Sequence, residues 1–173
     1  MKEIKLFITD IDGVWTDGGM YYDQTGNEWK KFNTSDSAGV LFLHLLKIPI
    51  AIITGEDSLI VQRRADKLKI NHLFMGIDDK LSVAKSLCKK LDITLQEVAF
   101  IGDDINDLNL LEAVGLSACP ANSPKYILDK VDWIIDVKGG DGVFRAFVEK
   151  YLEETNNLEE ALSRFQGKKA DNQ

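Results

Sequence analysis

Short, entirely apolar segments alternate along this chain with longer segments whose apolar residues recur at helical spacing. Within the short segments apolar and polar residues do not alternate, which is typical of strands that are buried on both faces. Strands and helices in alternation favour an α/β fold, a parallel sheet covered by helices on both faces. The predicted strands are Ile4–Ile8, Pro49–Ile53, Leu73–Met75, Val98–Ile101, Leu116–Cys119 and Trp133–Ile135.

The composition narrows the class of protein. With 173 residues and 45% hydrophobic content, the chain can form one globular domain with a sizeable core. A net charge of -7 without any basic run argues against nucleic-acid binding. No apolar run approaches the ~20 residues of a membrane helix, and Met1–Glu3 leads directly into a strand without a signal peptide. We therefore expect a soluble, cytoplasmic protein.

Two carboxylates, Asp10 and Asp12, follow the first predicted strand and precede Gly13. Residues two apart on a strand point the same way, so both side chains can face one small volume. Two like charges in a cleft repel each other, and a divalent cation or a shared proton is the usual remedy. An ordinary alternative is that one aspartate caps a helix while the other lies in a turn with Gly13.

Polar residues also follow three further predicted strands. Thr54 and Gly55 come after the second strand, Lys80 comes after the third, and an acidic cluster comes after the fourth. Each has an ordinary explanation as a helix cap or surface residue, but ligands of such sheets bind where the carboxyl ends of the strands meet. The acidic cluster is Asp103, Asp104 and Asp107.

Residues 14–32 predict a β-hairpin flap, with its turn at Gln24–Asn27. An isolated two-stranded ribbon cannot bury much aromatic surface by itself. The hairpin must therefore pack on the body of the protein or on another subunit, and both alternatives are open. Its aromatic residues are Trp15, Tyr21, Tyr22, Trp29 and Phe32.

These strand-end motifs, in this order, resemble the haloacid dehalogenase superfamily of phosphotransferases. The resemblance covers about residues 4–148 and implies a Rossmann-like three-layer fold. It also implies an aspartyl-phosphate mechanism, in which Asp10 is the nucleophile, Asp12 is the general acid and base, and Thr54 and Lys80 hold the phosphoryl oxygens. The implied metal ligands are Asp10, the main-chain carbonyl of Asp12, and Asp103, with Asp104, Asn106 and Asp107 orienting their neighbours.

The chemistry of these residue types agrees with the implied roles. A carboxylate that attacks a phosphate monoester must overcome repulsion between anions, which a metal and a lysine both reduce. Oxygen ligands together with water suit Mg²⁺ rather than a softer metal. We therefore expect a magnesium-dependent phosphatase that acts on a small molecule.

Within the superfamily, the chain resembles the capless phosphatases of 3-deoxy-octulosonate (KDO) 8-phosphate and nonulosonate (KDN) 9-phosphate. The matching segments are Ile11–Gly18, Ile53–Gly55, Gly102–Asp104 and Gly139–Arg145. The short segments after Gly13 and after Thr54 leave no room for a cap domain. The resemblance also implies a homotetramer that is assembled through the hairpin flap.

Two residues depart from the octulosonate pattern. Glu56 follows Thr54-Gly55 where an arginine is common, and Asp141 replaces a basic residue in the tail loop. A carboxylate there accepts hydrogen bonds from sugar hydroxyls, and Lys67, a turn beyond Arg64 on the second predicted helix, could supply the lost cation. These departures favour KDN 9-phosphate, with KDO 8-phosphate as the alternative. The expected substrate-binding residues are Thr54, Gly55, Glu56, Arg64, Lys67 and Lys80.

We expect residues 1–152 to form the phosphatase domain and residues 153–173 to form a C-terminal tail. The tail carries one weak amphipathic segment, Leu158–Phe165, so disorder and docking on a partner are both open. A non-catalytic assembly module, like the C-terminal domain of some cytidylyltransferases, is the main rival function. A response-regulator receiver is a second rival, although Gly76 stands where a receiver needs its phosphate acceptor.

Overall fold

The protein was analysed as a computed structural model, which describes residues 3–170 and the side chains up to residue 167. Its central sheet has six parallel strands in the order β5-β4-β1-β6-β7-β8. The strands are β1 Leu6–Thr9, β4 Ile50–Ile53, β5 His72–Phe74, β6 Val98–Ile101, β7 Leu116–Pro120 and β8 Trp133–Ile135.

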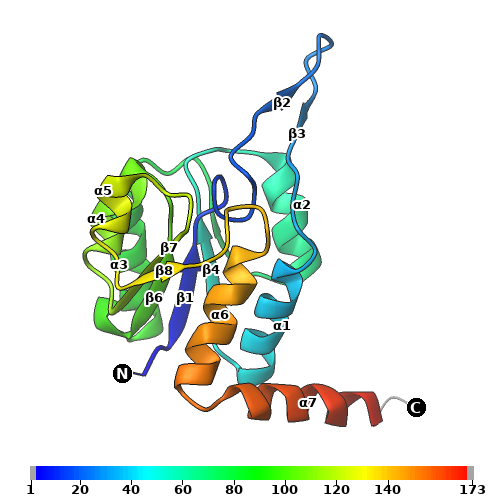
Figure 1. Ribbon diagram of the computed structural model, residues 1–173, viewed down its shortest axis with the longest axis vertical. Helices are drawn as coiled ribbons and strands as arrows, with labels where there is room; N and C mark the ends of the chain where they lie inside the picture. Colours follow the sequence, from blue (N-terminus) through cyan, green and yellow to red (C-terminus); the bar gives the residue numbers. More distant parts are fainter. Residues whose placement is uncertain (1–2, 171–173) are drawn as a thin grey trace.

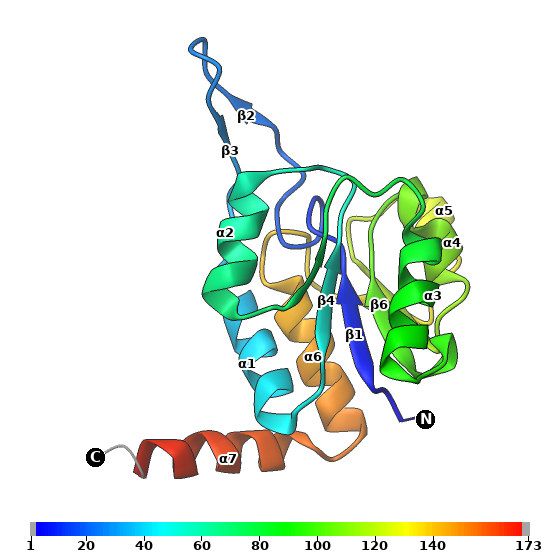
Figure 2. The same cartoon turned by 180° about the vertical axis from the view of Figure 1, so that it is seen from behind.

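Helices cover both faces of this sheet and give the three layers seen in Figures 1 and 2. Helices α1, α2 and α6 lie on one face, and helices α3, α4 and α5 lie on the other. The expected parallel α/β fold is confirmed. The helices are α1 Asp36–Leu46, α2 Leu59–Leu68, α3 Lys80–Leu91, α4 Leu108–Leu111, α5 Lys125–Leu128, α6 Val143–Glu154 and α7 Leu158–Ala170, with 3₁₀ turns η1 Leu95–Glu97 and η2 Ile105–Asp107.

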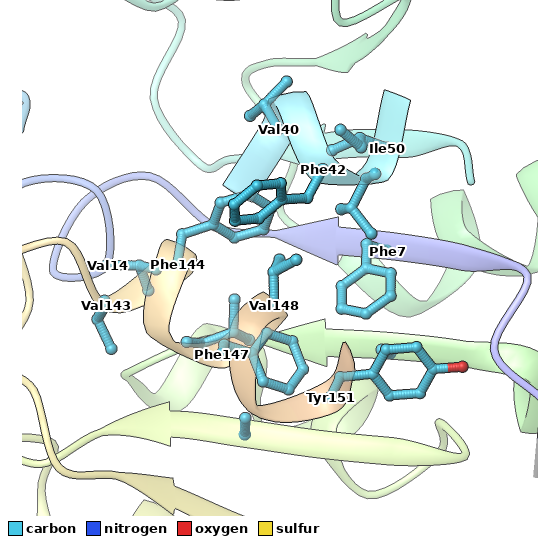
Figure 3. Close-up of a cluster of buried hydrophobic side chains, with 14 of the residues drawn as sticks. Phe7, Val14, Val40, Phe42, Ile50, Val143, Phe144, Phe147, Val148 and Tyr151 are labelled. Atoms are coloured by element: carbon cyan, nitrogen blue, oxygen red, sulfur yellow. The ribbon is translucent and has the colours of Figure 1, made fainter. Parts of the chain in front are cut away.

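The apolar strands serve two separate cores. In β1, Phe7 belongs to the core under α1 and α6, whereas Leu6 and Ile8 belong to the core under α3 and α4. Figure 3 shows the first core, where Phe7 packs against Phe147 and Tyr151 of α6 with ring centroids 5.5 and 5.2 Å apart. Burial on both faces explains why these strands contain no polar alternation.

The order of the strands creates a crevice at the tip of β1. From β1 the chain proceeds outward to β4 and β5, and then returns to the other side of β1 with β6. The carboxyl ends of β1 and β6 therefore lie side by side at the point where the strand order reverses. Open α/β sheets bind their ligands at this point.

The flap differs in part from the expected hairpin. Its strands are short, β2 Tyr21–Tyr22 and β3 Glu28–Trp29, and the hairpin stands away from the body in Figure 1. The extended strand expected from Val14 is wrong, because the N–H groups of Val14, Trp15 and Thr16 all donate to the Ile11 carbonyl in a tight turn. This turn buries the side chain of Trp15 completely.

The aromatic residues of the flap thus divide into two groups. Trp15 packs on Phe144 of α6, with ring centroids 5.1 Å apart, and Phe32 packs at the edge of the same core. The outer residues Tyr21, Tyr22 and Trp29 are 41%, 64% and 51% exposed. Packing on the body therefore accounts for the base of the flap only.

The C-terminal segment forms a helix within the described residues. Helix α7 crosses the ends of α1 and α6, and its Ala161 is completely buried in their core. Arg164 donates to the carbonyl oxygen of Leu45 at 2.6 Å and anchors α7 to the last turn of α1. No helix among the described residues is long and apolar enough to span a bilayer.

Candidate active site

Three buried charges occupy the tip of β1. The Asp10 N–H donates to the carbonyl of Ile101 in β6, which fixes Asp10 between the two central strands. The ammonium of Lys80, the first residue of α3, lies 2.9 Å from Asp10 Oδ1 and 2.6 Å from Asp107 Oδ1. The Lys80 side chain is fully buried, so these two carboxylates surround a cation that has no contact with solvent.

Asp107 holds the loop after β6 in place. Its Oδ2 accepts from the N–H groups of Asp103 and Asp104, at 2.9 and 3.3 Å, while its Oδ1 accepts from Lys80. Both oxygens are therefore used inside the protein. In this structure Asp107 orients its neighbours.

Three carboxylates here fit a hard cation. Oxygens of Asp10, Asp103 and Asp107 all lie within 4.8 Å of one another. Asp103 Oδ1 is buried and accepts no hydrogen bond from the described residues, so it retains free coordinating capacity. Gly13, with φ +82°, leaves the necessary space, because a Cβ at this position would collide with the Asp103 carboxylate. The donor set suits the predicted Mg²⁺.

The clustering of carboxylates changes their protonation. Burial, together with the negative charge of Asp107, raises the pKa of Asp10 to about 7. Burial, followed by the charges of Asp10 and Asp107, raises the pKa of Asp103 to about 8. Lys80 is affected in the opposite sense, because its two carboxylate partners outweigh the effect of burial and raise its pKa. A divalent cation would relieve this crowding of negative charge.

A cavity of about 260 Å³ opens over these residues. Its walls come from the ends of β1, β4 and β6, as expected for the crevice of such a sheet. Lys80 and Asp107 lie behind Asp10 and do not line it. The lining residues are Asp10, Asp12, Gly13, Gly18, Thr54, Gly55, Glu56, Asp103, Asp104 and Asn106.

Lys30 is a neighbour of the site that sequence reasoning missed. Its ammonium donates to Asp12 Oδ1 and to Glu56 Oε2, each at 2.6 Å, although it comes from the flap. These two bonds outweigh burial and raise the pKa of Lys30. One feature of the sequence could have indicated this position. Lys30 follows Trp29, and neighbouring residues of an extended strand point to opposite sides, so an outward Trp29 implies an inward Lys30.

Three of the expected substrate-binding residues do not line the cavity: Lys80, which is paired with Asp10 and Asp107, and two residues of α2. Arg64 donates to the Asn33 carbonyl and the Ser37 hydroxyl, and its guanidinium lies 5.9 Å from the centre of the Trp15 ring. Lys67 is exposed, in the last turn of α2. Both residues belong to α2, whose first turn follows Glu56, but they lie further along the helix.

The comparisons with known proteins agree with this geometry. Residues 53–147 match the model of a family described as haloacid dehalogenase-like hydrolase. The chain is 37% identical to 3-deoxy-D-manno-octulosonate 8-phosphate phosphatase KdsC of Haemophilus influenzae, over 88% of this chain and 85% of the relative.

Solved structures extend the likeness to three dimensions. One is 3-deoxy-D-manno-octulosonate 8-phosphate phosphatase from Moraxella catarrhalis in complex with magnesium, phosphate and KDO. It is 38% identical, with a TM-score of 0.90 over 94% of this chain and 93% of that chain. A probable YrbI family phosphatase from Pseudomonas syringae is 41% identical, with a TM-score of 0.91 over 95% and 94% of the two chains. The chain therefore belongs to the haloacid dehalogenase-like hydrolases and, among them, to the family of capless phosphatases that the strand-end motifs predicted.

Proposed function

We propose that this protein hydrolyses the phosphate monoester of a 2-keto-3-deoxy sugar acid with the help of Mg²⁺. The observation that carries this proposal is the cluster of Asp10, Asp103 and Asp107 with the buried Lys80, of which Asp10 and Asp103 line an open cavity. A purely architectural module has no need of two buried carboxylates, a third that is partly buried, and a buried cation, which cost free energy to desolvate. The cluster therefore argues against the rival assembly module.

In the proposed mechanism, Asp10 attacks phosphorus and the bond between phosphorus and the sugar oxygen breaks. Asp12 gives its proton to the departing alkoxide, and it later takes a proton from the water that hydrolyses the aspartyl-phosphate. Thr54, which lines the cavity, would hold a phosphoryl oxygen, and the ammonium of Lys80 beside Asp10 would supply positive charge to the phosphoryl group from beneath the cavity lining. Mg²⁺, held by Asp10, Asp103 and the Asp12 carbonyl, would neutralise the charge between nucleophile and ester.

The relatives bear on the choice of sugar. The residues at positions 56 and 141 favour KDN 9-phosphate, but two of the three relatives named above are phosphatases of 3-deoxy-D-manno-octulosonate 8-phosphate. The alternative, KDO 8-phosphate, is therefore better supported, and we take it as the first candidate. The coarser assignment, a phosphatase of 2-keto-3-deoxy sugar acids, includes both compounds.

KDN 9-phosphate remains the second candidate because of one observation at the cavity wall. Glu56 lines the cavity and is held by Lys30, so a carboxylate is fixed where it can accept hydrogen bonds from sugar hydroxyls. Asp141, the other departure, is exposed and does not line the cavity. The case for the second candidate therefore depends on Glu56.

The test is a comparison of kcat/KM in the presence of MgCl₂ for KDO 8-phosphate, KDN 9-phosphate and p-nitrophenyl phosphate. We expect one sugar acid phosphate to exceed the aryl ester by orders of magnitude, because well-placed polar contacts discriminate strongly. The Asp10→Asn variant is the control and should release no phosphate above background. Equal kcat/KM for all three esters would contradict the proposed substrate class.

The same proposal includes assembly as a homotetramer through the flap. The support is the exposed apolar surface of the hairpin, where Met20, Tyr21, Tyr22 and Trp29 are each at least 41% exposed. Light scattering after size-exclusion chromatography should give four times the chain mass. A Tyr22→Ser, Trp29→Ser double variant should give a smaller species, and a monomeric wild-type protein would refute this part.

A further inference from the structure

Lys30 connects the flap to the floor of the cavity. It directly follows β3, yet its ammonium reaches Asp12 Oδ1 in the loop after β1 and Glu56 Oε2 in the loop after β4. Its side chain is 3% exposed, although the neighbouring Trp29 is 51% exposed. One buried cation therefore joins three segments that are far apart in the sequence.

The two oxygens of the Asp12 carboxylate differ in their hydrogen bonding. Oδ1 accepts from Lys30 at 2.6 Å and from the Thr16 hydroxyl at 3.3 Å. Oδ2 is buried and accepts no hydrogen bond from any described residue. Lys30 thus fixes the rotation of the carboxylate through one oxygen, while the other oxygen keeps no hydrogen-bond partner among the described residues.

The flap is also held to the loop after β1 by hydrogen bonds to Asp17. The Tyr21 hydroxyl donates to Asp17 Oδ2 at 2.8 Å, and the Gly19 N–H donates to Asp17 Oδ1 at 2.9 Å. These contacts are exposed or only partly buried, and they hold the base of the hairpin over the loop. They explain how a residue of a projecting hairpin can be placed accurately enough to reach Asp12.

We propose that Lys30 is a positioning residue that orients Asp12 for proton transfer to the sugar oxygen and fixes Glu56 at the cavity wall. This inference rests on the proposed function, in which Asp12 serves the leaving alkoxide. It adds a residue from the flap to the machinery of the reaction. The position of the flap would then control the departure of the leaving group as well as any contact between subunits.

The test compares two esters that differ in their leaving group. An alkoxide needs a proton as it departs, whereas p-nitrophenolate is stable enough to leave without one. The parameter is kcat/KM, because it reports only the steps up to the departure of the leaving group. Lys30→Met removes the ammonium but keeps a side chain of similar length.

Lys31→Met is the matched control. It removes the same charge at the next position, but the Lys31 side chain is 64% exposed, and its ion pair among the described residues is the 3.7 Å contact to Asp17. If the Lys30→Met variant does not fold, the Lys30→Gln variant replaces it, and the same kinetic changes are expected. Circular dichroism verifies the fold of each variant.

For Lys30→Met we expect kcat/KM for the preferred sugar acid phosphate to fall by about 100-fold or more, the usual contribution of a positioned general acid. The fall for p-nitrophenyl phosphate should be several times smaller, and Lys31→Met should change neither value appreciably. An equal fall for both esters, or no fall for the sugar phosphate, overturns the role of Lys30. A wild-type protein that hydrolyses neither ester overturns the proposed function and, with it, this inference.

Discussion

The strand-end cluster and the hairpin flap both carry residues of the candidate site, but they are held in opposite ways. The cluster of Asp10, Lys80, Asp103 and Asp107 lies at the ends of buried strands, and Lys80 is held between two of its three carboxylates inside the protein. The flap projects from the body, and its outer aromatic residues are exposed. Only its base, through Lys30 and Trp15, is joined to the core.

This difference suggests that the strand ends and the flap contribute to the site in different ways. Strand ends in a rigid sheet can hold a nucleophile and metal ligands within small tolerances, as covalent phosphoryl transfer requires. A two-stranded hairpin is marginally stable by itself, so its conformation depends on contacts at its base and on whatever covers its outer surface. The flap is therefore the element through which the surroundings of the protein can affect the site.

The largest expected effect comes from removing the buried cation. Lys80→Met would leave Asp10 and Asp107 without their shared partner, so we expect a loss of about 3–5 kcal/mol in the free energy of unfolding. Phosphatase activity should fall to the level of Asp10→Asn. Chemical denaturation and phosphate release measure the two effects. A variant that is as stable as the wild type would show that the cluster is not held by Lys80.

A smaller effect is expected from Gly13→Ala. A side chain at φ +82° is strained, and its Cβ would displace the Asp103 carboxylate. The backbone strain alone costs about 1–3 kcal/mol, and Mg²⁺ affinity should fall because a metal ligand moves. Gly26→Ala is a useful control, since Gly26 has φ +88° in the hairpin turn but open space around its Cα. It should share the strain and retain Mg²⁺ affinity, as isothermal titration calorimetry can show.

The third prediction concerns pH. Because the pKa of Asp103 is raised to about 8 without metal, its carboxyl must lose a proton before it can bind Mg²⁺. Affinity should therefore rise as the pH increases from 6.5 to 8, by up to about tenfold per pH unit for each proton released, and should level off above pH 8.

The stability of the metal-free protein should change with pH in the opposite direction to Mg²⁺ affinity. Between the unfolded and folded pKa values the metal-free folded protein binds more protons than the unfolded chain, so its stability decreases as the pH rises. Added MgCl₂ should raise Tm more at pH 8 than at pH 6. Differential scanning fluorimetry tests this, and an increase in Tm that is independent of pH would contradict it.

The smallest effect on folding is expected at the tip of the flap. Trp29→Ser removes an exposed ring, so the free energy of unfolding of one chain should change by less than about 0.5 kcal/mol. Trp15→Ser, in contrast, removes a completely buried ring and should cost several kcal/mol. Comparable losses at both positions, measured at a concentration where the protein is monomeric, would remove the distinction between outer and basal aromatic residues.

Much of the fold was predictable because strands that are buried on both faces consist of consecutive apolar residues, which can be recognised in the sequence. The bounds of all six strands lie within two residues of the predicted apolar segments, and polar residues at the ends of β1, β4 and β6 meet as the order of parallel strands requires. The early turn at Ile11–Thr16 was missed, since Val14-Trp15-Thr16 has the β propensity of a strand. Its conformation is imposed by the buried packing of Trp15 on Phe144.

Local sequence thus determined the parallel sheet, the acidic pair at the tip of β1 and the family. The tertiary structure alone decided which charges are neighbours. Lys80 forms ion pairs with Asp10 and Asp107. Lys30 forms ion pairs with Asp12 and Glu56. Arg64 donates to the Asn33 carbonyl at the base of the flap. The partners of long, flexible side chains depend on which groups lie nearby in the folded protein. A contact between residues 18 or more positions apart, such as Lys30 and Asp12, produces no periodic pattern in the sequence.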